Sequence, residues 1–182
     1  MMVFGMKQNG VKNMEMKEKL LIFGKVRLIE CDGLKYPNFE DVDKAIKNGD
    51  AIISKWFYNV IPTVGRTAIA RRLVNAGLKA NEGIITYGAV GTGTNVAVNS
   101  DTKLQTEIAR KLCSQRNYLD NTIIIRTFFT TSEANGDLKE FGLFGEDASS
   151  TPDSGTLFER VNINKTKTSS KTLTIESAIT IS

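Results

Sequence analysis

The sequence contains no histidine among its 182 residues. Histidine is the commonest general base in enzymes and the commonest side-chain ligand for metal ions. Its absence excludes a Ser-His-acid triad and a Cys-His pair. The sequence also singles out no pair of acids for the two-carboxylate chemistry of glycosidases. We therefore expect a protein that is not an enzyme, with no catalytic site, no cofactor-binding site and no metal site.

Cysteine is scarce as well, because Cys31 and Cys113 are the only two and lie far apart. Neither belongs to a Cys-x-x-Cys pair, the spacing used by zinc sites and by thioredoxin-like redox sites. Free cysteines are among the most buried residue types. We expect two buried free thiols.

Long apolar runs are also missing. No stretch approaches the roughly 20 apolar residues that a membrane-spanning helix needs, and no apolar signal core lies within residues 1–19. The 24 basic and 20 acidic side chains give a net charge of +4, which is too mild to predict nucleic-acid binding. We expect no membrane partner, no nucleic-acid partner and no secretion by a signal peptide.

Short segments of alternating polar and apolar residues, separated by turn signals, make up most of the chain. They predict a mainly β protein, an antiparallel β-sandwich of about eight strands with two or three short helices. Residues 20–182 are expected to form this single domain, preceded by an N-terminal arm at 1–19. The expected strands cover 20–30, 51–61, 84–90, 112–119, 122–131, 138–145, 156–163 and 172–181. The expected helices cover 38–49, 62–76 and 101–111.

The stretch Gly91-Thr92-Gly93-Thr94 resembles a glycine-rich phosphate-binding loop. A dinucleotide fingerprint needs a third glycine where Val96 stands, and a P-loop needs a terminal Gly-Lys-Ser/Thr. We therefore predict a structural corner that ends a strand, in which Gly91 or Gly93 adopts backbone angles costly for other residues. In the helix expected to follow, Leu104 and Ile108 form the inner face.

Candidate core residues follow from the apolar positions of these segments. Three arginines on the 62–76 helix are expected to lie on a solvated outer face: Arg66, Arg71 and Arg72. Three aromatic residues are expected in the core or in strand pairs, with a sugar-binding platform as the alternative: Tyr36, Trp56 and Tyr118. The predicted core comprises Ile85, Tyr87, Val90, Leu104, Ile108, Phe128, Phe141, Leu143, Phe144, Leu157 and Ile175.

Several motifs follow one another in a characteristic order. They are Thr-x-Gly-Arg-x-x-Ile-Ala from Thr63, Ile-Thr-Tyr-Gly-Ala-Val-Gly-Thr-Gly-Thr from Ile85, Lys-Glu-Phe-Gly-Leu-Phe from Lys139, and a terminal Thr-x-Thr-Ile strand from Thr172. From about Lys25 to the C-terminus the sequence resembles a domain of tailed-bacteriophage virion proteins. It is similar to the N-terminal domain of phage tail-collar fibre proteins.

The resemblance implies a structural component of a virion, assembled in the cytoplasm of the host bacterium. Such a chain would be a tail, collar or baseplate connector, or a fibre-attachment protein, and would bind other virion proteins. The alternatives are a capsid decoration protein and a receptor- or glycan-binding module of the virion. The sequence ends where the resembling domain ends, which favours the connector and decoration functions over a complete fibre.

The first residues carry few strong core formers besides Phe4 and methionines. Ordering such a segment costs chain entropy, which burial against a partner offsets. We therefore expect a homo-oligomer or docked subunit laced by residues 1–19, with packing of the arm on its own domain as the alternative.

Overall fold

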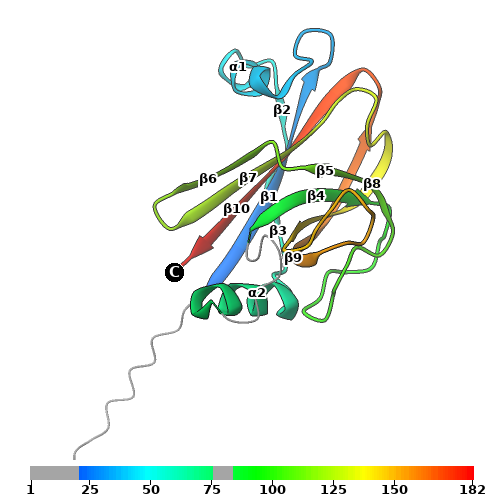
Figure 1. Ribbon diagram of the computed structural model, residues 1–182. Coiled ribbons are helices and arrows are strands. Elements are labelled where there is room, and N and C mark those ends of the chain that lie inside the picture. Colours follow the sequence, from blue (N-terminus) through cyan, green and yellow to red (C-terminus); the bar gives the residue numbers. More distant parts are fainter. Residues whose placement is uncertain (1–20, 76–83) are drawn as a thin grey trace, which may run out of the picture.

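The computed structural model describes residues 21–75 and 84–182, which are mainly antiparallel strands (Figure 1). Within these residues one sheet has six strands in the order β2-β1-β10-β7-β6, with β3 also paired to β1, and the other has four in the order β5-β4-β8-β9. The predicted antiparallel β-sandwich is therefore confirmed. The strands are β1 (Ile22–Asp32), β2 (Ile52–Ile53), β3 (Phe57–Tyr58), β4 (Ile85–Gly91), β5 (Glu107–Leu112), β6 (Gln115–Leu119), β7 (Thr122–Phe129), β8 (Gly136–Gly145), β9 (Thr156–Lys167) and β10 (Lys171–Ile181).

Each of the eight expected strand segments contains a strand. The 51–61 segment holds two short ones, β2 and β3, and both pair antiparallel with β1 as the predicted hairpin requires. The helices expected at 38–49 and 62–76 are also confirmed. The helical elements are η1 (Phe39–Asp41), α1 (Val42–Lys47) and α2 (Thr63–Val74). Helix α2 ends at Asn75, whose φ of 51° is left-handed, whereas the predicted stop at Gly77 lies outside the described residues.

The helix predicted at 101–111 is wrong. Residues 107–112 form β5, which pairs with β4 at the edge of the smaller sheet. Leu104 is buried as expected, but the side chain expected beside it, Ile108, is 46% exposed. The spacing of four between these residues suits a helix, but in the strand the register with β4 shifts at Ile108, which has no paired residue there and whose side chain is exposed.

The central core fills the space between the two sheets. In β10 the alternate residues Leu173, Ile175 and Ile179 point into it, and Val26 and Leu28 of β1 join them. From the smaller sheet it receives residues of β4, β8 and β9, among them Val90, Phe141, Leu143 and Val161. Nine of the eleven predicted core residues are buried; Tyr87 is partly buried and Ile108 is exposed.

Two further apolar clusters lie on the outer faces of the sheets. Helices η1 and α1 pack against one end of the larger sheet, where Phe39 of η1 meets Phe128 of β7 edge-to-face with ring centroids 6.1 Å apart. On the smaller sheet, Leu104 packs with Phe144 and Leu157. Strand β8 is therefore buried on both faces, which explains its nearly continuous burial from Leu138 to Gly145.

Both cysteines are free thiols, as predicted. Cys31 is buried and Cys113 is partly buried. Burial raises the pKa of both thiols, that of Cys113 to about 11. Because the thiolate is the reactive form, neither thiol is activated at neutral pH.

Candidate functional site

The loop after β4 is fixed by the buried carboxylate of Glu140 on β8. Its Oε1 accepts hydrogen bonds from the backbone N–H groups of Gly93 (3.0 Å) and Thr106 (2.8 Å), and its Oε2 accepts one from the N–H of Gln105 (3.0 Å). The side chain of Glu140 has no exposed surface. Loop donors that would otherwise be buried without a partner are thereby satisfied. This arrangement holds the loop onto the outer face of the smaller sheet.

Arg160 on β9 completes this buried polar cluster. Its Nε and Nη2 lie 2.9 and 2.8 Å from Oε2 of Glu140, and its Nη1 donates to Asp101 Oδ2 at 2.9 Å. Nη2 also donates to the carbonyl of Asn95 at 3.0 Å. The side chain is only 2% exposed. The charged groups of this cluster therefore bind the loop backbone and one another, and the role of the cluster is structural.

The backbone conformation predicted for Gly91 and Gly93 is wrong. Neither is among the described glycines with positive φ, which are Gly49, Gly136 and Gly155. The glycines are needed for space instead. A Cβ on Gly91 would lie 2.3 Å from the carbonyl oxygen of Thr106 and 2.5 Å from Oε1 of Glu140, and one on Gly93 would lie 2.4 Å from the same Oε1. The glycines therefore let a carboxylate approach the backbone at the place where a nucleotide loop would hold a phosphate.

We expect Gly91→Ala to lower the free energy of unfolding by about 1–3 kcal/mol, because the added methyl overpacks a buried backbone contact. Chemical denaturation measures this change. Thr94→Val is a matched control, because Thr94 is exposed in the same loop, and it should stay within about 0.5 kcal/mol of wild type. Equal stability of both variants would show that the loop tolerates a side chain at Gly91.

The arginines of α2 have three different environments. Arg66 donates a hydrogen bond to the carbonyl of Ile61 at 2.8 Å, just before the first residue of α2. Arg71 forms an ion pair with Glu146, whose side chain is 1% exposed, so the expected solvated face is wrong for Arg71. Arg72 is exposed and lies at the groove described below. The helix itself packs close to β9, since a Cβ on Gly65 would lie 2.6 Å from the carbonyl oxygen of Phe158.

The three aromatic residues considered for a sugar platform do not form one. Tyr36 is buried under α1. Trp56 is partly buried, and Lys25 and Arg27 stack on it with their charged groups 4.5 and 4.8 Å from the ring centroid. Tyr118 is 75% exposed and belongs to a different surface on β6.

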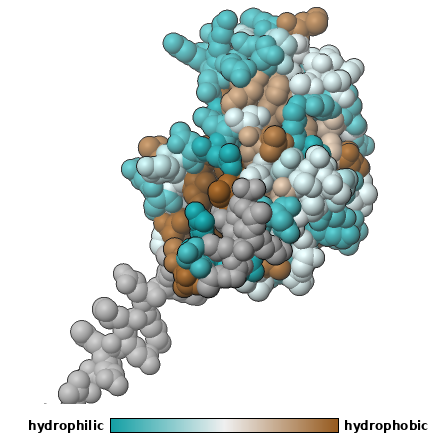
Figure 2. All heavy atoms as spheres, in the orientation of Figure 1, coloured by the Kyte–Doolittle hydropathy of each residue, from teal (hydrophilic) through white to brown (hydrophobic). Residues whose placement is uncertain are grey.

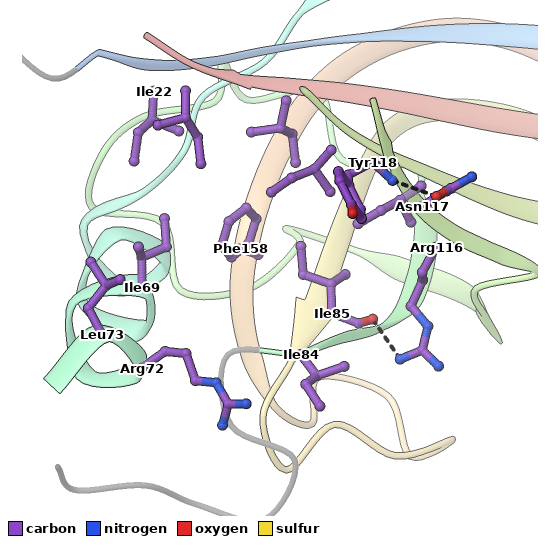
Figure 3. Close-up of a pocket in the computed structure, with 14 residues that line it drawn as sticks. Ile22, Ile69, Arg72, Leu73, Ile84, Ile85, Arg116, Asn117, Tyr118 and Phe158 are labelled. Carbon is purple, nitrogen blue, oxygen red and sulfur yellow. Dashed lines mark hydrogen bonds between the residues drawn. The ribbon is translucent and has the colours of Figure 1, made fainter. Parts of the chain in front are cut away.

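That surface is an apolar groove with a volume of about 450 Å³ between α2 and the β6–β7 hairpin (Figures 2 and 3). It opens at the end of the sandwich where β1 begins and β10 ends. Eight of its fourteen lining residues are isoleucines. The groove is lined by Ile22, Ile69, Arg72, Leu73, Ile84, Ile85, Arg116, Asn117, Tyr118, Ile123, Ile125, Phe158, Ile179 and Ile181.

The rim of the groove combines exposed apolar side chains with two cations. Leu73 is 79% exposed on α2, and Ile84 is 40% exposed just before β4. Figure 3 shows Arg72 and Arg116 on either side of Ile84, and Arg116 Nη1 lies 3.4 Å from the carbonyl oxygen of Ile85. An apolar floor with cations at the edge suits an occupant that carries apolar side chains next to an acid.

The sequence did not reveal this groove. Its isoleucines lie in strand and helix segments whose sequence pattern is that of ordinary core residues. Only the fold brings them together at one open end of the sandwich.

Within residues 21–75 and 84–182, no group of three or more acids and cysteines is placed to hold a metal ion. No helix in the same ranges is long and apolar enough to cross a bilayer. Comparisons with protein-family models, with curated proteins and with solved structures found no match to this chain.

Proposed function

We propose that this chain is a structural component of a tailed-phage virion, acting by protein–protein assembly and not by catalysis. Its place in the particle would be a tail, collar or baseplate connector, or a fibre-attachment site. The order of the sequence motifs, from the Thr63 helix to the terminal strand, supports this assignment. The structural observation that carries it is the open apolar groove beside α2.

An open apolar surface is costly for a protein that works alone. Large exposed apolar patches on soluble domains mark interaction sites or aggregation hazards. Here Leu73, Ile84 and Tyr118 border the groove, and their side chains are 79%, 40% and 75% exposed. A subunit that is always docked in a particle buries such a surface permanently. The proposed partners are therefore copies of the same chain and other virion proteins, and neither nucleic acid nor membrane is needed.

Capsid decoration is the second candidate within the same class of function, because it also requires only docking surfaces. A receptor- or glycan-binding module receives less support. Sugar platforms need exposed aromatic faces, and of the three aromatic residues proposed for one, Tyr36 is buried and Trp56 is covered by cations.

Quantitative mass spectrometry of purified particles tests the proposal. We expect the chain in particles at a fixed copy number, because a structural subunit follows the symmetry of its assembly. Three to a few dozen copies would indicate a tail, neck or baseplate position, and hundreds would indicate capsid decoration. Absence of the chain from particles that are otherwise complete would refute the proposal. Binding of the isolated protein to host cells would instead favour the receptor-binding alternative.

A further inference from the structure

The groove beside α2 requires an occupant of definite chemistry. Its volume of about 450 Å³ and isoleucine walls suit a few flexible apolar side chains. Arg72 and Arg116 flank the opening at Ile84, so an acid next to those apolar side chains would be favoured there. The occupant should therefore present apolar side chains on both sides of a carboxylate.

A segment of this description lies near the N-terminus of the chain itself. All five methionines of the protein lie within its first sixteen residues, at positions 1, 2, 6, 14 and 16. Methionine is flexible and polarizable, and it adapts to irregular apolar surfaces at interfaces. Glu15 stands between Met14 and Met16, so this tripeptide matches an apolar groove with a cationic rim.

We propose that the groove of one subunit binds the N-terminal segment of a second copy of this chain, with Met14 and Met16 in the groove and Glu15 facing Arg72 and Arg116. This inference rests on the proposed function, for which it specifies the partner and the contact. It assigns to residues 1–20 a receptor surface on a neighbouring subunit.

Exchange between copies is favoured over binding within one chain by the start of β1. Leu21 is already paired with Ser182, because each donates its N–H to the other's carbonyl (2.6 and 2.9 Å). Within one chain only residues 17–20 separate Met16 from Leu21, so this short segment would have to carry Met14 and Met16 back to the groove beside Ile22. These residues are Lys-Glu-Lys-Leu and include no glycine, proline, asparagine or aspartate, the residues that turns prefer. An extended segment of 20 residues reaches up to about 70 Å, which is enough to cross to a neighbour.

Cysteine cross-linking between two full-length variants tests the exchange. One variant carries Met16→Cys and the other carries Tyr118→Cys at the groove rim, where the tyrosine is 75% exposed. After mixing and mild oxidation, we expect a mixed disulfide dimer to form at least about tenfold faster than for a control pair, because a bound arm raises the effective concentration of the two thiols. The control pair replaces Tyr118→Cys with Leu34→Cys, because Leu34 is 96% exposed outside the groove. Native Cys31 and Cys113 remain in place, since burial keeps both thiols protonated.

A second measurement uses the native mass of otherwise wild-type chains. Leu73→Asp, at an exposed position of the groove, should weaken self-association, whereas Leu34→Asp should leave it unchanged. Equal cross-linking rates for the two cysteine pairs would refute the exchange. So would a monomeric chain in which Met16→Cys and Tyr118→Cys, combined in one molecule, form only an internal disulfide. If the chain is present in particles but shows no such cross-link, the groove assignment fails and the proposed function remains. If the cross-link forms but the chain is absent from particles, the proposed function fails and the groove assignment remains.

Discussion

Replacing Glu140 with glutamine is expected to lower the free energy of unfolding by about 3–5 kcal/mol, the range measured when one partner of a buried ion pair is removed. The Glu140 side chain has no exposed surface and its partner Arg160 is 2% exposed, so water cannot solvate the guanidinium that loses its carboxylate partner. Both oxygens of the carboxylate accept hydrogen bonds, whereas the glutamine side chain has one oxygen and an NH2 group that cannot accept. That NH2 group would face hydrogen-bond donors, which are the N–H groups of Gly93, Gln105 and Thr106 and the guanidinium of Arg160. The substitution therefore leaves several buried donors without an acceptor.

Chemical denaturation with hydrogen exchange measures this effect and its location. Exchange should accelerate first in residues 92–106, the loop that Glu140 holds. Glu133→Gln is the matched control, because Glu133 is 37% exposed and pairs with the 34% exposed Lys111 at the surface. Surface ion pairs contribute under about 1 kcal/mol, so the control should change stability little. Equal losses in the two variants would show that the buried cluster has no special role.

The role of Glu140 explains why two of the sequence motifs occur together. The first ends in Gly91-Thr92-Gly93-Thr94, and the second contains Glu140 in Lys-Glu-Phe-Gly-Leu-Phe. In the structure the carboxylate of the second motif meets the backbone of the first. Both motifs are visible in the sequence, which predicts the glycines to form a backbone corner. Contact between residues 47 positions apart could not be read from either motif.

The same carboxylate accounts for the helix predicted in error. In a helix beginning at Asp101, the N–H groups of Gln105 and Thr106 would donate to carbonyls four residues earlier. Instead they donate to Glu140, and the following residues pair with β4. Local spacing of Leu104 and Ile108 predicted a helix because it carries no information on these long-range partners.

The strands were easier to predict because their signal is local. Strand β10 alternates between core residues such as Leu173 and Ile175 and residues on the other face, as half-buried strands do. The groove was not predictable for the opposite reason. Ile22 and Ile69 both look like core positions in the sequence, but each is only partly buried, because burial at this end depends on how far the opposing layer extends.

Glu159 on β9 also lies where no local pattern would place a carboxylate, between the two sheets. It is fully buried, and its Oε2 accepts hydrogen bonds from Ser177 Oγ (2.8 Å) on β10 and from Asn59 Nδ2. Its Oε1 has no hydrogen-bond partner among the described residues. Burial raises the pKa of Glu159 to about 7, although the hydrogen bonds from Ser177 and Asn59 lower it. Glu159 therefore tends to stay protonated in the folded state at mildly acidic pH.

This raised pKa makes stability depend on pH in a defined direction. Below pH 4.5, the ordinary pKa of glutamate, the folded and unfolded states both hold the proton. Between about 4.5 and 7 only the folded state holds it, so stability falls as pH rises. Above about 7 both states are ionised and the loss is complete. A shift from 4.5 to about 7 corresponds to about 3 kcal/mol at 1.36 kcal/mol per pH unit.

Glu159→Gln should therefore stabilise the protein at pH 8 by up to about 3 kcal/mol and have little effect near pH 4, because a neutral amide replaces a side chain that is costly only when ionised. Denaturant titrations of both proteins from pH 4 to pH 8 measure the difference, which should grow across the interval from 4.5 to 7. Glu40→Gln is the control, because Glu40 is exposed and its replacement should leave the difference from wild type small across the range. If Glu159→Gln instead destabilised the protein equally at every pH, the ionised carboxylate would be satisfied in the folded core. The cost of burial would then be offset by its hydrogen bonds with Ser177 and Asn59.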